Sequence, residues 1–166
     1  MDANNSSRTR RGTAPITSEL SRYNIDIAPL SETRLADEGS LNDMASGYTF
    51  FWKGLPANSP RIHGVGFAIR TKLLQTLPES PVGFSERLMT LRIPIAKHRY
   101  ATFIRTYAPT LPSDDETKDH YYAMLQSTLM LVPRKDKLIV LGDFNTRIGE
   151  LALILRSGEI SWTSTA

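Results

Sequence analysis

The segment KLIVLGDFNTRIG, at residues 137–149, restricts the possible folds more than any other part of the chain. It contains a continuous apolar run, Leu138–Leu141, and such a run predicts a strand that is covered on both faces. Gly142, Asp143 and Asn145 follow directly. Side chains two positions apart on extended chain point the same way, so Asp143 and Asn145 offer a carboxylate and an amide to one ligand. The same residue types also favour a plain turn, and this segment alone leaves both interpretations open.

A second segment, IDIAPLSETR at residues 25–34, repeats this design with an apolar run that ends beside Glu32. If the two strand ends are neighbours, Glu32 lies beside Asp143. Two carboxylates with several waters satisfy Mg²⁺. The alternative is a solvated Glu32 that pairs with Arg34. Pro29 removes a backbone donor, and in a central strand it would displace Glu32 from this position.

Four segments in order resemble the endonuclease/exonuclease/phosphatase superfamily, and they read NIDIAPLSETRL, HGVGFAIRTKLL, FIRTYAPT and KLIVLGDFNTRIG. The wording of SETRL, YTFFWKG and LPSDDETKD is most similar to the endonuclease domains of non-LTR retrotransposons and to craniofacial development protein-like sequences. The resemblance covers residues 10–149, and four ordered motifs are more specific than any one of them. It implies an α+β fold, a partial two-sheet β-sandwich flanked by helices.

The resemblance also implies a chemistry, the hydrolysis of DNA phosphodiester bonds supported by Mg²⁺ or Mn²⁺. Glu32 falls on the family's metal-ligating glutamate, and Tyr107 falls on a tyrosine near the scissile phosphate. Asp143 and Asn145 fall on the pair that orients the attacking water and holds the phosphoryl oxygens. Asp143 is expected at the metal as well. Without the resemblance, Tyr107 reads as a half-buried aromatic side chain at a strand end.

The family completes its site with a Ser-Asp-His motif late in the domain and with an asparagine on a first strand. Residues 150–166 and the polar, basic residues 1–12 match neither. The expected organisation is a disordered arm at 1–12, a partial domain at 13–149 and a divergent tail at 150–166, with impaired activity. The alternatives are a noncatalytic nucleic-acid-binding or interaction module and a gene fragment without function.

The composition limits the number of domains, the cellular location and the partners that we expect for this chain. Its 166 residues with 40% hydrophobic content suit one domain, and the lack of cysteine excludes a disulfide framework. Without a long apolar run or a charged leader, we expect no membrane contact and an intracellular location, with the nucleus as one option. The net charge of +3 is concentrated in N-terminal arginines, so DNA as a partner rests on the resemblance. The histidines are interpreted as surface or edge residues: His63, His98 and His120.

Hydrophobic periodicity predicts the remaining elements. A helix is expected from about residue 13, and Ser113 with Glu116 matches a capping box that starts a second helix, which ends at Pro133. Tyr122 is expected on the apolar face of this second helix. Strands are expected at 48–53, 65–69, 88–95 and 100–107, the last two as an antiparallel hairpin.

Overall fold

The computed structural model describes residues 14–143, together with the backbone of residues 150–156 and 159–164. A helix at residues 14–22 opens the described chain. The elements that follow are β1 (Ile27–Ser31), β2 (Glu38–Asp43), β3 (Tyr48–Lys53), β4 (Val65–Arg70), α2 (Thr71–Leu74), β5 (Val82–Ser85), β6 (Leu88–Ala96), β7 (Arg99–Tyr107), α3 (Asp115–Leu131), β8 (Lys137–Asp143), β9 (Glu150–Arg156) and β10 (Glu159–Ser164).

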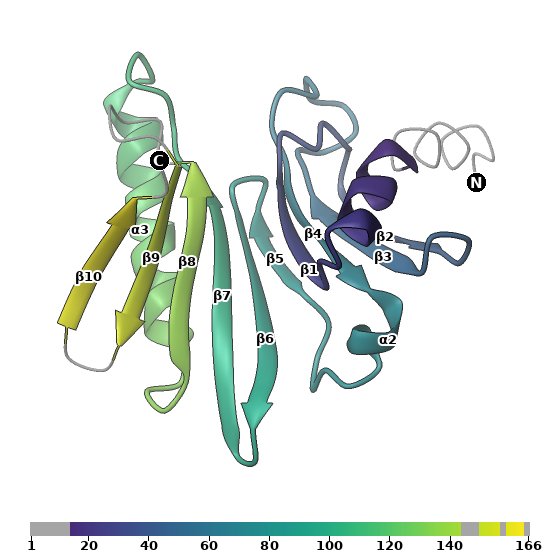
Figure 1. Cartoon of the computed structure of the whole chain (residues 1–166). Helices are drawn as coiled ribbons and strands as arrows, with labels where there is room; N and C mark the ends of the chain where they lie inside the picture. The colour runs from purple at the N-terminus through teal and green to yellow at the C-terminus, as the bar shows by residue number, and fades with distance from the viewer. Residues whose placement is uncertain (1–13, 144–149, 157–158, 165–166) are drawn as a thin grey trace.

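The strands form two sheets (Figure 1). The first has the order β1-β4-β3-β2, and all of its neighbouring strands are antiparallel. The second has the order β10-β9-β8-β7-β6-β5, in which β7 and β8 are parallel and α3 connects them. β9 and β10 extend this sheet beyond β8 as antiparallel strands. The predicted α+β fold with two sheets and flanking helices is therefore confirmed.

The core lies between the facing sides of the two sheets. Val65, Phe67 and Ile69 occupy alternate positions of β4 and are fully buried. They belong to one cluster with Met89 and Leu91 of β6, in the other sheet. Because side chains alternate across a strand, this pattern fixes the register of each strand: a slip by one residue would turn the apolar set away from the core.

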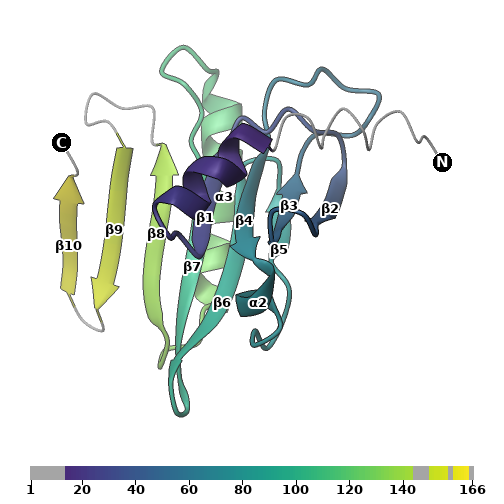
Figure 2. The ribbon, with the colours of Figure 1, turned by 45° about the vertical axis from the view of Figure 1, so that its right-hand side comes forward.

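A helix covers the outer face of each sheet (Figure 2). Leu20 of the helix at residues 14–22 packs into a cluster on the first sheet, with Tyr48, Phe50 and Ala68. On the second sheet, α3 contributes partly buried side chains to a cluster of buried residues, and the members are Leu88, Ile104, Val140, Met124, Leu125 and Leu129. The domain is thus built in four layers, helix, sheet, sheet and helix.

Pro29 lies on an edge strand. Among the described strands β1 pairs with β4 alone, and Pro29 stands opposite Phe67 in this pairing. The missing amide hydrogen therefore does not interrupt a central ladder, because a strand at an edge has one side without ladder partners. Pro29 would displace Glu32 only if β1 were a central strand, and β1 lies at the edge of its sheet.

The start of α3 differs from the predicted capping box by one position. Asp114 is the N-cap, and its carboxylate accepts a hydrogen bond from the Thr117 amide at 2.7 Å. The Ser113 hydroxyl instead shares a hydrogen bond with the Thr110 hydroxyl. Tyr122 is exposed, against the prediction, whereas the preceding residue, Tyr121, is buried. Adjacent helix positions are about 100° apart, so only one of the two can face the sheet.

Candidate active site

The candidate site lies at one end of the sandwich, where several strand ends meet. Antiparallel pairing places the end of β1 beside the start of β4, because Ser31 stands opposite Val65. The start of β6 lies beside the end of β7, and the parallel partners β7 and β8 end together at Tyr107 and Asp143. Both sheets therefore present loops at the same rim.

Glu32 projects from the segment that follows β1. The Tyr107 hydroxyl donates to its Oε1 at 3.1 Å, and Arg34 Nη2 donates to its Oε2 at 3.1 Å. The hydrogen bond from Tyr107, followed by that from Arg34, lowers the pKa of Glu32 below its ordinary value. The carboxylate is thus held in its charged form, and 46% of the side chain is exposed. It is paired and accessible at the same time.

The backbone around Glu32 is unusual. Glu32 and Arg34 adopt positive φ angles of 48° and 53°, a region that few residues other than glycine occupy. Two hydrogen bonds to the segment before β4 hold this conformation, from Thr33 N to the Gly64 carbonyl at 3.1 Å and from Arg34 N to the His63 carbonyl at 3.2 Å. Gly64 has φ 137°, and a Cβ at this position would collide with the Thr33 hydroxyl. Backbone strain of this kind is concentrated at functional sites.

Tyr107 connects Glu32 with Asp143. Tyr107 belongs to the core cluster and is 7% exposed, yet its hydroxyl reaches Glu32 on the other sheet. In the β7–β8 pairing it stands opposite Asp143, and the amide of the next residue, Ala108, donates to the Asp143 carbonyl at 2.9 Å. Asp143 is partly buried. The two carboxylates therefore come from different sheets, and not from neighbouring strands of one sheet.

Arg87 is a site residue that sequence reasoning missed. Its Nη1 donates to the Tyr107 carbonyl at 3.2 Å, its Nη2 lies 2.9 Å from His63 Nε2, and its Nε lies 3.5 Å from Glu86 Oε1. The guanidinium also lies over the Tyr107 ring, 5.6 Å from the ring centre. Only 12% of the side chain is exposed. Arg87 thus fixes the backbone and the ring of Tyr107 from the turn before β6.

His63 is the second residue that was missed. It is partly buried, and its ring centre lies 5.9 Å from that of Tyr107. Burial, followed by the charge of Arg87, lowers the pKa of His63. Arginine can only donate, so Nε2 accepts and the proton of the neutral ring lies on Nδ1. Nδ1 is buried and makes no hydrogen bond within the described residues; the Ile62 backbone favours protonation, but less than burial and Arg87 oppose it.

His63 and Arg87 contact residues that are far away in the sequence, and no local sequence pattern indicates these contacts. Arg87 lies 20 residues from Tyr107 and 24 from His63. The available signal is limited to position, because His63 precedes a predicted strand and Arg87 lies between two predicted strands. His98 and His120 are exposed, as predicted, whereas His63, which was grouped with them, is partly buried against Tyr107.

The donor atoms at this rim suit a hard cation. Glu32 and Asp143 supply carboxylate oxygens, and Mg²⁺ in proteins commonly uses one or two carboxylates and keeps several waters. Among the described residues there is no cluster of three or more histidine, cysteine, aspartate or glutamate side chains. A dedicated protein cage is therefore absent from this part of the chain, and the residues fit a cation that shares its coordination with water and substrate. Asn145, also predicted here, lies outside the described residues.

Curated proteins similar to this chain share its sequence at a moderate level. Craniofacial development protein 2 from Bos taurus is 27% identical over 134 residues, which are 81% of this chain and 22% of that protein. The protein of the same name from Tragulus javanicus matches with the same identity and coverage. The chain therefore spans less than a quarter of the length of these relatives.

Solved structures share the fold at lower identity. D. rerio TDP2, humanized by 14 mutations, has a TM-score of 0.52 and 17% identity, and the match covers 88% of this chain and 58% of that chain. ANGEL2, described as a 2',3'-cyclic phosphatase, has a TM-score of 0.53 and 17% identity, with 79% and 42% coverage. At such identities the likeness concerns the fold.

In the part of the chain that the structure describes, no helix has the length and apolar character needed to cross a membrane. The model of the Endonuclease/Exonuclease/phosphatase family matches residues 2–161. This match extends over nearly the whole sequence and agrees with the two-sheet fold. We conclude that the chain belongs to the endonuclease/exonuclease/phosphatase family.

Proposed function

We propose that this chain hydrolyses phosphodiester bonds of DNA with Mg²⁺ or Mn²⁺ at the rim formed by Glu32, Tyr107 and Asp143. The observation that carries the proposal is the hydroxyl of Tyr107. It crosses from one sheet to Glu32 on the other at 3.1 Å, while the backbone of Tyr107 is paired with Asp143. Residues far apart in sequence thereby share one rim, and the resemblance of the sequence motifs assigns all three to site positions of the family.

Each residue has a proposed role. Glu32 and Asp143 would hold the cation, which supplies Lewis-acid stabilisation of the phosphoryl oxygens and lowers the pKa of bound water. The Tyr107 hydroxyl would donate to a phosphoryl oxygen when substrate is present. Arg87 holds Tyr107 by its carbonyl and ring, so it would act as a positioning residue. Asn145 remains the proposed second phosphate contact, outside the described residues.

The names of related structures support phosphate chemistry on this fold. One D. rerio TDP2 structure is described as complexed with a single-strand DNA product, and ANGEL2 is described as a phosphatase. The first favours DNA as the substrate class proposed here. Retroelement origin, impaired activity and a nuclear location stay predictions.

Nicking of supercoiled plasmid tests the proposed function. We expect nicking with Mg²⁺, none with a chelator, and a loss of about 10²-fold or more in Asp143→Asn, since charge stabilisation is the largest catalytic contribution in most enzymes. Asp115→Asn is the matched control: it makes the same change at a side chain that is 97% exposed on α3. Equal loss in both variants, or nicking without metal, would contradict the proposal. Metal-independent DNA binding with no nicking would instead favour the noncatalytic module.

A further inference from the structure

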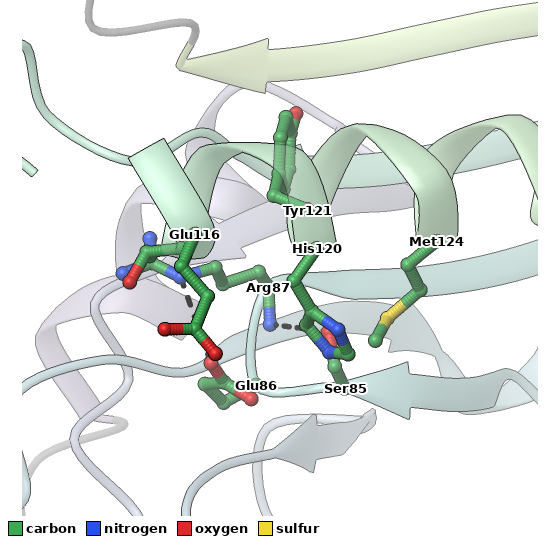
Figure 3. A pocket seen from close by; sticks show the side chains of 8 residues that line it. Ser85, Glu86, Arg87, Glu116, His120, Tyr121 and Met124 are labelled. Carbon is green, nitrogen blue, oxygen red and sulfur yellow. Dashed lines mark hydrogen bonds and ion pairs between the residues drawn. The ribbon is translucent and has the colours of Figure 1, made fainter. Parts of the chain in front are cut away.

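A pocket of about 390 Å³ lies next to the candidate active site (Figure 3). The last residue of β5 and the turn before β6, residues 85–87 together, form one side of it. Glu116, His120 and Met124 of α3 form the opposite side. These three residues are spaced four apart, so they lie on one face of the helix, and Figure 3 shows their side chains directed toward the turn. The volume is within the range of small-molecule sites.

The Arg87 side chain belongs both to the pocket and to the candidate active site. It lines the pocket, and the same side chain contacts Tyr107 and His63. A group that enters the pocket would therefore lie beside the position proposed for the scissile phosphate. The pocket is placed to receive the part of a substrate that neighbours that phosphate.

The charges of the pocket argue against a phosphate as its occupant. Each of the three guanidinium nitrogens of Arg87 already has a partner, namely the Tyr107 carbonyl, His63 and Glu86. Two carboxylates, Glu86 and Glu116, line the same space. The pocket thus offers acceptors more readily than donors, and it suits an uncharged group that carries N–H donors.

We infer that this pocket receives the nucleobase next to the scissile phosphate and prefers bases with an exocyclic amine. The inference rests on the proposed function for the backbone path of the substrate. Glu116 would accept from the amine, as glutamate does from the N4 amine of cytosine. His120 and Met124 would contact the face of the base, because aromatic rings and the polarizable thioether tolerate any base.

Binding in the presence of a chelator tests this inference without any need for hydrolysis. Fluorescein-labelled oligodeoxycytidylate, oligothymidylate and an abasic strand of the same length are titrated with the 166-residue chain, and the anisotropy is recorded. We expect cytidylate to bind about fivefold tighter than thymidylate, the size of one added hydrogen bond to a base edge. Both should bind tighter than the abasic strand.

Two variants and one control assign the effect to the pocket. Glu116→Gln should abolish the preference for cytidylate over thymidylate, and His120→Ala should bring both to the affinity of the abasic strand. Asp115→Asn removes the same charge from the same turn of α3, but Asp115 does not line the pocket. It should retain the preference.

The inference is overturned by equal affinity for the three strands, by an equal loss in Glu116→Gln and Asp115→Asn, or by the absence of binding to any strand. Its failure can be distinguished from failure of the proposed function. A chain that nicks plasmid but does not distinguish bases retains the function and lacks the base pocket. A chain that distinguishes bases but never nicks has the pocket without the hydrolysis.

Discussion

Replacing Asp136 by asparagine should destabilise the fold at a point far from the proposed chemistry. Asp136 precedes β8, and its side chain is 2% exposed. It accepts from Arg92 Nε at 2.7 Å, from Arg92 Nη2 at 3.1 Å and from Thr102 Oγ1 at 2.8 Å. These contacts attach the turn after α3 to β6 and β7. An asparagine keeps one acceptor and turns an amide donor toward a guanidinium that can only donate.

The expected loss is about 2–3 kcal/mol in the free energy of unfolding. Breaking a fully buried ion pair by removing one partner costs about 3–5 kcal/mol. The value here should be lower, because the Arg92 side chain is 28% exposed and keeps its position 3.8 Å from the centre of the Tyr100 ring. For a domain of this size the melting temperature should fall by roughly 4–10 °C.

The loss should depend on pH in a defined direction. Hydrogen bonds from Arg92 lower the pKa of Asp136, against the opposing effect of burial, and Thr102 lowers it further. A carboxylate with a lowered folded pKa contributes its full stability above the unfolded pKa, about 3.9, and loses it as pH falls through the folded pKa. The difference between the parent chain and Asp136→Asn should thus be constant above about pH 5 and shrink below about pH 4.

Urea unfolding at several pH values measures this difference, with Asp26→Asn as the control. Asp26 also pairs with an arginine, Arg70, at 2.6 Å, but the two side chains are 59% and 31% exposed. Exposed pairs contribute about 0–1 kcal/mol. If Asp136→Asn costs no more than Asp26→Asn at neutral pH, or if its effect grows as the pH is lowered, the reasoning from burial and pairing is refuted.

Three further predictions concern the candidate site. Tyr107→Phe should fold normally, because the ring contacts remain, and lower Mg²⁺-dependent plasmid nicking about tenfold through loss of one hydrogen bond; unchanged nicking would remove the hydroxyl from the mechanism. Arg34→Ala frees an oxygen of Glu32, so calorimetry should show Mn²⁺ binding about two- to threefold tighter, and weaker binding would speak against competition. Gly64→Ala should cost about 2–3 kcal/mol in urea unfolding, against about 1 kcal/mol for Gly47→Ala, which also has positive φ but an open surrounding; equal costs would contradict the close packing at Gly64.

Much of the fold could be predicted because local pattern and burial agree. The hairpin of β6 and β7 and the existence of strand β8 follow from apolar runs and alternation alone, although in β8 only Val140 and Gly142 are buried and the rest of the apolar run is partly buried. The exact start of α3 did not follow, because Ser113 and Asp114 are both good caps and the choice depends on the loop before them. The effect of Pro29 required the strand order, which no local pattern contains.

The residues of the candidate site also fall into those that could be predicted from the sequence and those that could not. Glu32, Tyr107 and Asp143 were predicted from family motifs, and the structure brings them to one rim. His63 and Arg87 could not be predicted, because their importance lies in contacts to each other and to Tyr107 across separate loops. Such contacts arise only when the two sheets are assembled.

The bridge from Tyr107 to Glu32 has a mechanical consequence. At this rim the Tyr107 hydroxyl reaches from the second sheet to Glu32 beside the first sheet, and the contact of Arg87 with His63 joins the same two halves. Any ligand that binds Glu32 and Asp143 at the same time would connect the two sheets. Because such a ligand binds the folded chain and not the unfolded one, it would stabilise the fold by a free energy that grows with the logarithm of its concentration. Occupancy of the rim and resistance to heat should therefore rise together.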